Sequence, residues 1–179
     1  MIVTKTAIPE VLVLEPRVFE DRRGAFFEAY NRKTFSSIGI STDFVQDNQS
    51  TSKKHVLRGL HYQVRQPQGK LIRVLTGEIF DVAVDCRKSS TSLGKFVNVI
   101  LSAQNRKMLW IPAGFAHGFL VLSDTAEVFY KTTDFYEPQF ERTLLWNDPQ
   151  LSIPWPCAAP LLSEKDRQGK LLREAEMFD

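Results

Sequence analysis

The sequence predicts an all-β fold, in the form of a double-sheet jelly roll or small barrel with one or two short helices. Short apolar stretches separated by turn signals are typical of such folds. The 13 Phe residues also favour a β-rich core, because aromatic side chains pack well on a pleated sheet. We expect strands at residues 11–14, 44–49, 56–62, 71–75, 79–85, 97–101, 108–111, 117–122 and 128–132.

The stretch 79–85 gives the clearest strand signal. Its apolar residues from Phe80 to Val84 occupy every second position, and Asp81 and Asp85 occupy the opposite face. A Thr-Gly turn signal precedes it.

Two short segments have helix signals. Residues 31–38 have an N-cap candidate in Asn31 and a terminating Gly39. The tail, residues 163–179, begins with a serine and an aspartate at capping-box spacing, so a second helix is expected there.

Length and composition indicate one globular domain. No shift in composition divides residues 1–179, and the proline-rich residues 149–160 are predicted to cross the surface toward the C-terminal segment. A net charge of +2 is too balanced for nucleic-acid binding through bulk charge. No apolar run approaches the roughly 20 residues of a membrane span. With Cys86 and Cys157 expected to be reduced thiols, we expect a cytoplasmic protein with neither a membrane nor a nucleic acid as partner.

One segment resembles the second motif of the cupin superfamily. Pro112, Gly114 and His117 fit its Pro-x-Gly-x-x-His pattern. The superfamily's first motif supplies two further histidines and a glutamate to a metal, whereas the corresponding region here has only His61, with Lys70 as its next distinctive polar residue. Three or four ligands must converge on a divalent metal, and an ammonium repels it. We therefore expect a cupin-like jelly roll, or double-stranded β-helix, that holds no metal.

A cavity in such a fold needs its polar side chains on one face. Arg58 and His61 are three residues apart, so a regular strand would send them to opposite faces. Gly59 between them is a suitable site for a bulge, and we predict an irregularity there. The candidate polar set comprises Arg23, Glu28, Gln46, Asn48, Arg58, His61, Lys70, His117 and Tyr130.

Further runs resemble the dTDP-4-dehydrorhamnose 3,5-epimerase family, in order and at the family's spacing from about Pro16 to Asp166. They are FEDRRGAFFE at 19–28, FVQDN at 44–48, VLRGLHYQ at 56–63, GKL at 69–71, WIPAGFAHGF at 110–119 and LSEKD at 162–166. The resemblance implies a homodimeric enzyme without cofactor or metal. It would invert C3 and C5 of dTDP-4-dehydro-6-deoxy-D-glucose, giving dTDP-4-dehydro-L-rhamnose.

The chemistry of that reaction explains the residue types. The ketone at C4 acidifies the hydrogens on C3 and C5, because the carbanion is delocalised as an enolate. The resemblance implies that His61 is the base, Tyr130 the general acid and Lys70 the partner of the enolate oxygen. It also places Asp166 behind His61, where a carboxylate fixes the tautomer. Asp81 is an alternative partner, and Tyr130 has an alternative role as a core aromatic.

The resemblance also implies a nucleotide-sugar site, with Phe19 stacked on thymine and Arg23 and Arg58 on the diphosphate. Some of these residues would come from the partner chain. The implied substrate-binding residues are Phe19, Arg23, Glu28, Gln46, Asp47, Asn48, Arg58, Lys70, His117, Glu141 and Lys165.

Three other functions stay open at this point. The first is an epimerase that inverts only C3 or only C5 of another nucleotide deoxysugar. The second is a metal-dependent cupin oxygenase or isomerase, and the third is a cupin that binds sugars without turnover. The sequence alone gives neither the order of the two inversions nor the deoxysugar pathway.

Overall fold

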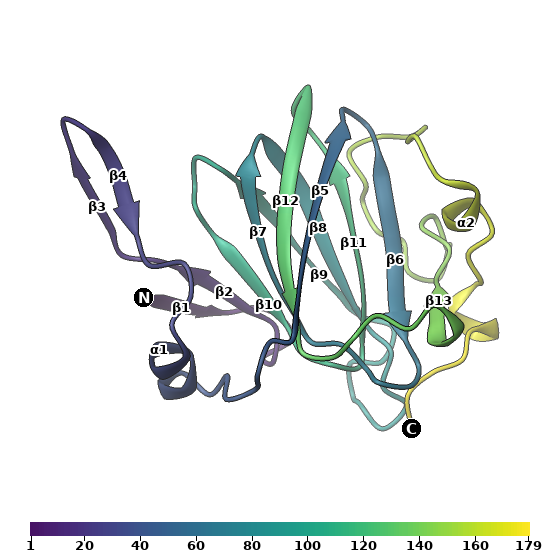
Figure 1. Ribbon diagram of the computed structural model, residues 1–179. Helices are drawn as coiled ribbons and strands as arrows, with labels where there is room; N and C mark the ends of the chain where they lie inside the picture. The colour runs from purple at the N-terminus through teal and green to yellow at the C-terminus, as the bar shows by residue number, and fades with distance from the viewer.

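Two antiparallel sheets form the body of the protein, and a computed structural model describes all of residues 1–179 (Figure 1). The first sheet has the strand order β1 (Ile2–Lys5), β2 (Leu12–Glu15), β10 (Met108–Ile111), β7 (Lys70–Thr76), β12 (Thr125–Thr132) and β5 (Gln46–Lys53). The second has the order β13 (Glu141–Thr143), β6 (Leu57–Gln63), β11 (Phe115–Val121), β8 (Glu78–Asp85) and β9 (Phe96–Ser102). The predicted all-β, double-sheet class is confirmed.

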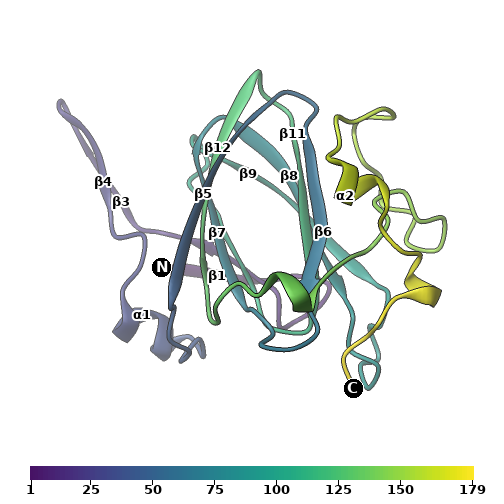
Figure 2. The same ribbon diagram turned by 45° about the vertical axis from the view of Figure 1, so that its right-hand side comes forward.

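The main core lies where the two sheets face each other (Figure 2). Ile72 and Leu109 of the first sheet belong to the same buried cluster as Ile79, Ala83 and Phe119 of the second. In β8 both faces are buried, because Phe80 and its alternate neighbours pack against the C-terminal segment on the far side of the sheet. Alternate residues of β8 therefore face two different buried layers, the main core on one side and the C-terminal segment on the other, and neither face is exposed to solvent.

Each outer face of the two sheets has its own cover. Phe35 of α1 (Arg32–Ser37) packs with Leu14, Leu71 and Met108 on the first sheet. Residues 144–179 cross the second sheet, where Leu151 and Leu172 complete another buried cluster. The C-terminal segment thus runs along β6 and can present side chains to that strand (Figure 1).

The helix predicted at 31–38 is confirmed. The Asn31 side chain accepts hydrogen bonds from the backbone N–H groups of Lys33 and Thr34, and Gly39 follows the helix with a φ of +90°. Only part of the tail is helical: α2 (Glu164–Arg167) and a 3₁₀ turn, η2 (Leu172–Glu174). Leu172 packs into the core and donates its N–H to Asp148 at 2.6 Å, so the chain leaves the helical path to follow the sheet.

Four strands were not expected from the sequence: β1, β13, and the hairpin strands β3 (Val18–Asp21) and β4 (Gly24–Phe27). None of them has an alternating buried face, since their order comes from pairing with a neighbouring strand. A 3₁₀ turn, η1 (Pro138–Phe140), precedes β13. No helix of the protein is both long and apolar enough to cross a membrane.

The β3–β4 hairpin extends away from the body of the protein (Figure 1). Its two strands pair only with each other, and its aromatic residues Phe19 and Phe26 are 52% and 71% exposed. The hairpin therefore presents apolar surface outside the two main sheets.

Candidate active site

A cavity of about 330 Å³ opens between the facing strands of the two sheets. Its lining residues come mainly from β5, β7 and β12 of the first sheet and from β6, β11 and β13 of the second, and Figure 2 shows the two sheets facing each other. Most of its lining is polar, and the residues that line it are Gln46, Asn48, Ser50, Arg58, His61, Tyr62, Gln63, Gln68, Lys70, His117, Phe119, Tyr130, Tyr136, Glu141 and Lys165.

The predicted irregularity at Gly59 is confirmed. On β11, His117 and Phe119 are two residues apart, yet they pair with His61 and Arg58 of β6, which are three apart. One extra residue is therefore accommodated in β6, where Gly59 has a φ of +117°. This bulge turns both Arg58 and His61 into the cavity, although regular alternation would separate them.

The base candidate His61 is held by a carboxylate from the C-terminal segment. Its Nε2 lies 2.6 Å from Oδ1 of Asp166, and Oδ2 of the same carboxylate accepts a hydrogen bond from Ser163 Oγ at 2.7 Å. Burial pushes the pKa of Asp166 upward, but hydrogen bonds from His61 and Ser163 outweigh it and leave the pKa below its ordinary value. The carboxylate is thus ionised, and a neutral His61 that donates through Nε2 keeps its lone pair on Nδ1.

The other candidate carboxylate, Asp81, contacts a different histidine. Both of its oxygens lie 3.0 Å from Nε2 of His117, and the Asp81 side chain is fully buried. Burial raises the pKa of Asp81 above its ordinary value, although the interaction with His117 opposes the shift. The structure therefore contains two separate histidine–carboxylate pairs. The two histidines lie opposite each other on the paired strands β6 and β11, and the carboxylates come from β8 and α2.

Lys70 and Tyr130 enter the cavity from the sheet opposite His61. Lys70 on β7 is buried, and its Nζ donates to the backbone oxygen of His61 at 3.4 Å. Burial lowers the pKa of Lys70 to about 8, so its ammonium is retained at neutral pH. Tyr130 lies on β12, and burial raises the pKa of its phenol even though Arg58 pulls it down. A protonated phenol therefore faces the imidazole across the cavity.

Polar side chains along β5 form two separate hydrogen-bonded pairs. Arg58 donates from Nε to Ser52 Oγ at 2.9 Å, and Gln46 donates to Asn48 Oδ1 at 2.9 Å. Fixed donors and acceptors of this kind orient a polar ligand with little loss of side-chain entropy.

A cluster at the rim connects α2 to β13. Lys165 Nζ lies 2.9 Å from both oxygens of Glu141, and Tyr136 donates its phenol proton to the same carboxylate at 3.0 Å. Lys165 is the residue before Asp166, so this ion pair also fastens the turn that carries the carboxylate behind His61.

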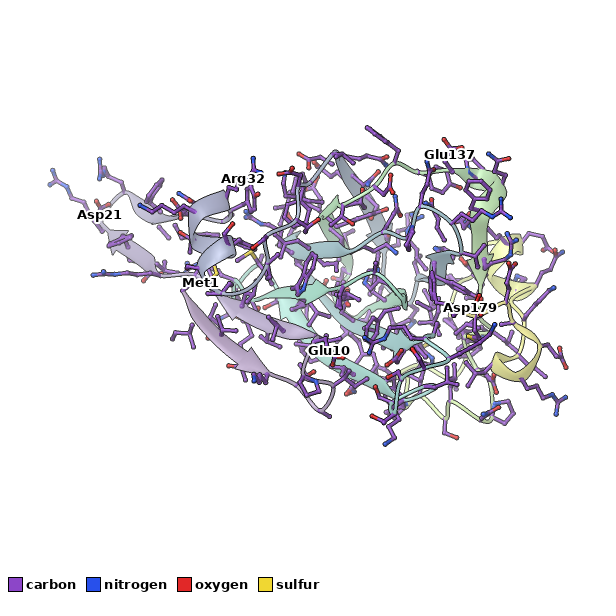
Figure 3. All side chains as sticks on the ribbon, turned by 90° about the horizontal axis from the view of Figure 1, so that it is seen from below. Met1, Glu10, Asp21, Arg32, Glu137 and Asp179 are labelled. Carbon is purple, nitrogen blue, oxygen red and sulfur yellow. The ribbon has the colours of Figure 1, made fainter.

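Four of the predicted substrate-binding residues lie outside this cavity. Phe19 and Arg23 are in the β3–β4 hairpin, and Glu28 accepts from Asn31 and Thr34 beside α1. Asp47 points to the outer face of β5, where it pairs with Lys131 at 2.6 Å. Figure 3 shows Asp21, at the hairpin turn, at the opposite end of the molecule from Glu137, which precedes β13. Within one chain, these four side chains do not join the other predicted residues.

Several lining residues were missed by the sequence analysis. Ser50 follows Gln46 and Asn48 at a spacing of two, and Phe119 follows His117 in the same way, so strand parity was a usable signal for both. Gln63 likewise follows His61 at a spacing of two on β6, whereas Tyr136 reaches the cavity through a chain path that no local pattern reveals. No three His, Cys, Asp or Glu side chains gather as metal ligands would.

Comparisons with known proteins identify relatives over almost the whole chain. The model of the dTDP-4-dehydrorhamnose 3,5-epimerase family matches residues 5–174. A dTDP-4-dehydrorhamnose 3,5-epimerase from Pseudomonas aeruginosa is 59% identical over 177 residues, covering 98% of each chain.

Solved structures agree with this relationship. A dTDP-6-deoxy-D-glucose-3,5-epimerase from Legionella pneumophila, in complex with dTDP-4-keto-L-rhamnose, has a TM-score of 0.95 and 49% identity, covering 97% of this chain and 94% of that one. A 3'-monoepimerase from Streptomyces bikiniensis, in complex with dTDP-quinovose, has a TM-score of 0.88 and 30% identity, with coverage of 94% and 87%. The match of the family model and the identity to its members show that this chain belongs to the dTDP-4-dehydrorhamnose 3,5-epimerase family.

Proposed function

We propose that this protein inverts C3 and C5 of dTDP-4-dehydro-6-deoxy-D-glucose and releases dTDP-4-dehydro-L-rhamnose. One observation supports the mechanism: an imidazole hydrogen-bonded to a carboxylate and a half-buried phenol line one cavity from opposite sheets. Inversion at a carbon requires a base on one face of the sugar and an acid on the other. His61 and Tyr130 line the cavity from different sheets, so we assign the base to His61 and the acid to Tyr130.

The first step removes a proton from carbon. Nδ1 of His61 accepts the hydrogen on C3 or C5, and the electron pair of the C–H bond moves into the ring to form an enolate at C4. Asp166, on Nε2, stabilises the imidazolium that results. A positioned base of this kind contributes roughly 10²–10⁴ in rate.

The second requirement is to stabilise the enolate oxygen. Lys70 lines the same cavity as His61 and donates a hydrogen bond to its backbone oxygen. Its ammonium has been desolvated in advance, so its attraction for a developing oxyanion is stronger than it would be in water.

Reprotonation then comes from the far side. Tyr130 donates its phenol proton to the carbanionic carbon, on the face opposite the one from which His61 removed a proton. Proton exchange with solvent restores His61 and Tyr130 before the second carbon reacts. No cofactor takes part in these steps, since every proton and electron pair is accounted for by the sugar, the two side chains and water.

We further propose that the protein acts as a homodimer. Phe19, Arg23 and Glu28 do not line the cavity of their own chain, whereas the hairpin that carries Phe19 and Arg23 extends outward with exposed aromatic residues. A partner chain that inserts this hairpin beside the cavity would complete the nucleotide site with the thymine and diphosphate contacts.

The proposal includes one domain over residues 1–179 in the cytoplasm. Two observations support it: the C-terminal segment shares a core with the second sheet, and both cysteines are unpaired, with Cys86 buried.

The experiment is turnover of dTDP-4-dehydro-6-deoxyglucose in deuterated water with a chelator present, followed by NMR. Deuterium at both C3 and C5 is expected. Incorporation at a single carbon would assign the protein a single inversion, the activity named for the Streptomyces bikiniensis relative. Substrate binding without any deuterium exchange would indicate a protein that binds sugars without turnover. Activity that disappears when the chelator is added would indicate a metal-dependent enzyme.

A further inference from the structure

Ser50 has a property that no other residue of the chain has. Its Oγ is the only buried side-chain nitrogen or oxygen without a hydrogen-bond partner. Solvent does not reach that oxygen in its present rotamer, so water does not satisfy it either. An unsatisfied buried hydroxyl destabilises the folded protein, and a methyl group in its place would avoid that cost.

The neighbours of Ser50 on the same face of β5 are all satisfied. Gln46 and Asn48 bond to each other, and Ser52 accepts from Arg58. The unpaired hydroxyl is therefore not a general feature of this polar strand. It is confined to the one position that lies between the pair beside Tyr130 and the serine that holds Arg58.

The charge around Ser50 points to an anionic ligand. Arg58 uses only Nε within the protein, so both of its terminal nitrogens are free to donate, and no carboxylate pairs with it. Ser50 lines the same cavity. A hydroxyl donor close to an unpaired guanidinium matches an oxygen of a phosphate group.

Reaching such a ligand costs Ser50 little. A serine side chain has three staggered rotamers. Rotation about χ1 breaks no hydrogen bond here, because none is made, and it moves the hydroxyl from its buried position toward the cavity that the residue lines.

We propose that Ser50 binds substrate by donating a hydrogen bond to a phosphate oxygen of the nucleotide sugar, beside Arg58. This inference rests on the proposed function for the identity of the ligand. The unpaired hydroxyl lowers the stability of the free protein, and the ligand satisfies it.

The test measures binding of dTDP by calorimetry and the melting temperature of the free protein, for wild type and Ser50→Ala. We expect dTDP affinity to fall roughly tenfold or more, as for the loss of a hydrogen bond to a charged group. The melting temperature should stay equal or rise. Thr51→Ala is the matched control, since Thr51 is exposed on the opposite face of β5, and it should leave affinity unchanged.

Ser52→Ala supplies the contrast, because it removes a hydroxyl that has a partner and should lower the melting temperature. If Ser50→Ala binds dTDP within twofold of wild type, or melts lower as Ser52→Ala does, the assignment is overturned. Turnover by the wild type distinguishes failure of the Ser50 assignment from failure of the proposed function. If the wild type epimerises its substrate and Ser50→Ala binds dTDP as tightly as the wild type, only the role of Ser50 is refuted. A wild type without turnover refutes the proposed function.

Discussion

His61 Nε2 and Asp166 Oδ1 lie 2.6 Å apart, although the two residues are separated by 105 positions in the chain. The contact exists because the C-terminal segment crosses the second sheet and delivers α2 beside β6. Ser163 both caps α2 and bonds to the second oxygen of the same carboxylate. A single short turn thus positions the group that orients the imidazole.

Asp166→Asn should preserve the fold and lower turnover by at least about two orders of magnitude, because an amide can present its N–H to Nε2 and stabilise the wrong tautomer. Steady-state rates and circular dichroism measure the two effects. Ser163→Ala removes only the hydroxyl behind the carboxylate and should have a smaller effect. Equal rates for Asp166→Asn and wild type would show that the carboxylate has no part in catalysis.

His61→Asn and Tyr130→Phe should each reduce turnover by roughly 10²-fold or more, since each removes a proton-transfer group. Isotope exchange separates their roles. Without the base, no deuterium should enter the substrate. Without the acid, exchange at carbon should persist with loss of inversion. Near-normal rates in both variants would rule out the proposed pair.

The pKa of Lys70 predicts opposite trends for activity and stability. Because burial lowers it to about 8, turnover should decline as pH rises through that value and the ammonium is lost. Between about 8 and the ordinary lysine value, the unfolded chain binds a proton that the native chain does not, so the contribution of Lys70 to the free energy of unfolding rises with pH.

The pH–rate profile and urea unfolding at several pH values test both trends. Lys70→Gln should lose roughly 10²–10³ in turnover and lack the alkaline decline. An alkaline decline of the same size in Lys70→Gln would assign it to another group.

Gly59→Ala should destabilise the protein far more than an ordinary glycine substitution. A Cβ at Gly59 would lie 2.5 Å from Gly118 Cα and 2.7 Å from the backbone oxygen of His117. Gly39→Ala is the matched control, because Gly39 also has a positive φ but has open space around it. Urea unfolding should give about 1–2 kcal/mol for Gly39→Ala and at least roughly 3 kcal/mol for Gly59→Ala. Equal losses would mean that the close approach of β6 and β11 is not required.

Arg23 should act on the cavity of the partner chain. Arg23→Ala and His61→Asn are each expected to be nearly inactive as homodimers. When the two are co-expressed, the mixed dimer has one cavity with both residues intact and one with neither, so activity should return. If no activity returns although mixed dimers are isolated, Arg23 acts within its own chain or not at all.

The sequence was sufficient to predict most of the strands and the cap of α1, because strand alternation and helix capping are local properties. It also determined the irregularity at Gly59, since two polar residues three apart on one strand can share a face only through a bulge. Hydrophobicity was a poorer guide to the bounds of β5. It predicted a strand at residues 44–49, whereas the strand pairs with β12 as far as Lys53, and its inner face is polar because it lines the cavity.

Which carboxylate forms a hydrogen bond with which histidine could be learned only from the three-dimensional structure. Asp81 and Asp166 were both candidates for His61, and nothing local distinguishes them. The pairing of β8 with β11 places Asp81 beside His117, and the packing of the C-terminal segment places Asp166 beside His61. Likewise, the resemblance predicts Phe19 and Arg23 as site residues, but within one chain they lie on a hairpin that pairs only with itself and do not line the cavity. Contacts between distant segments depend on how whole sheets and segments pack, and a short stretch of sequence does not encode that packing.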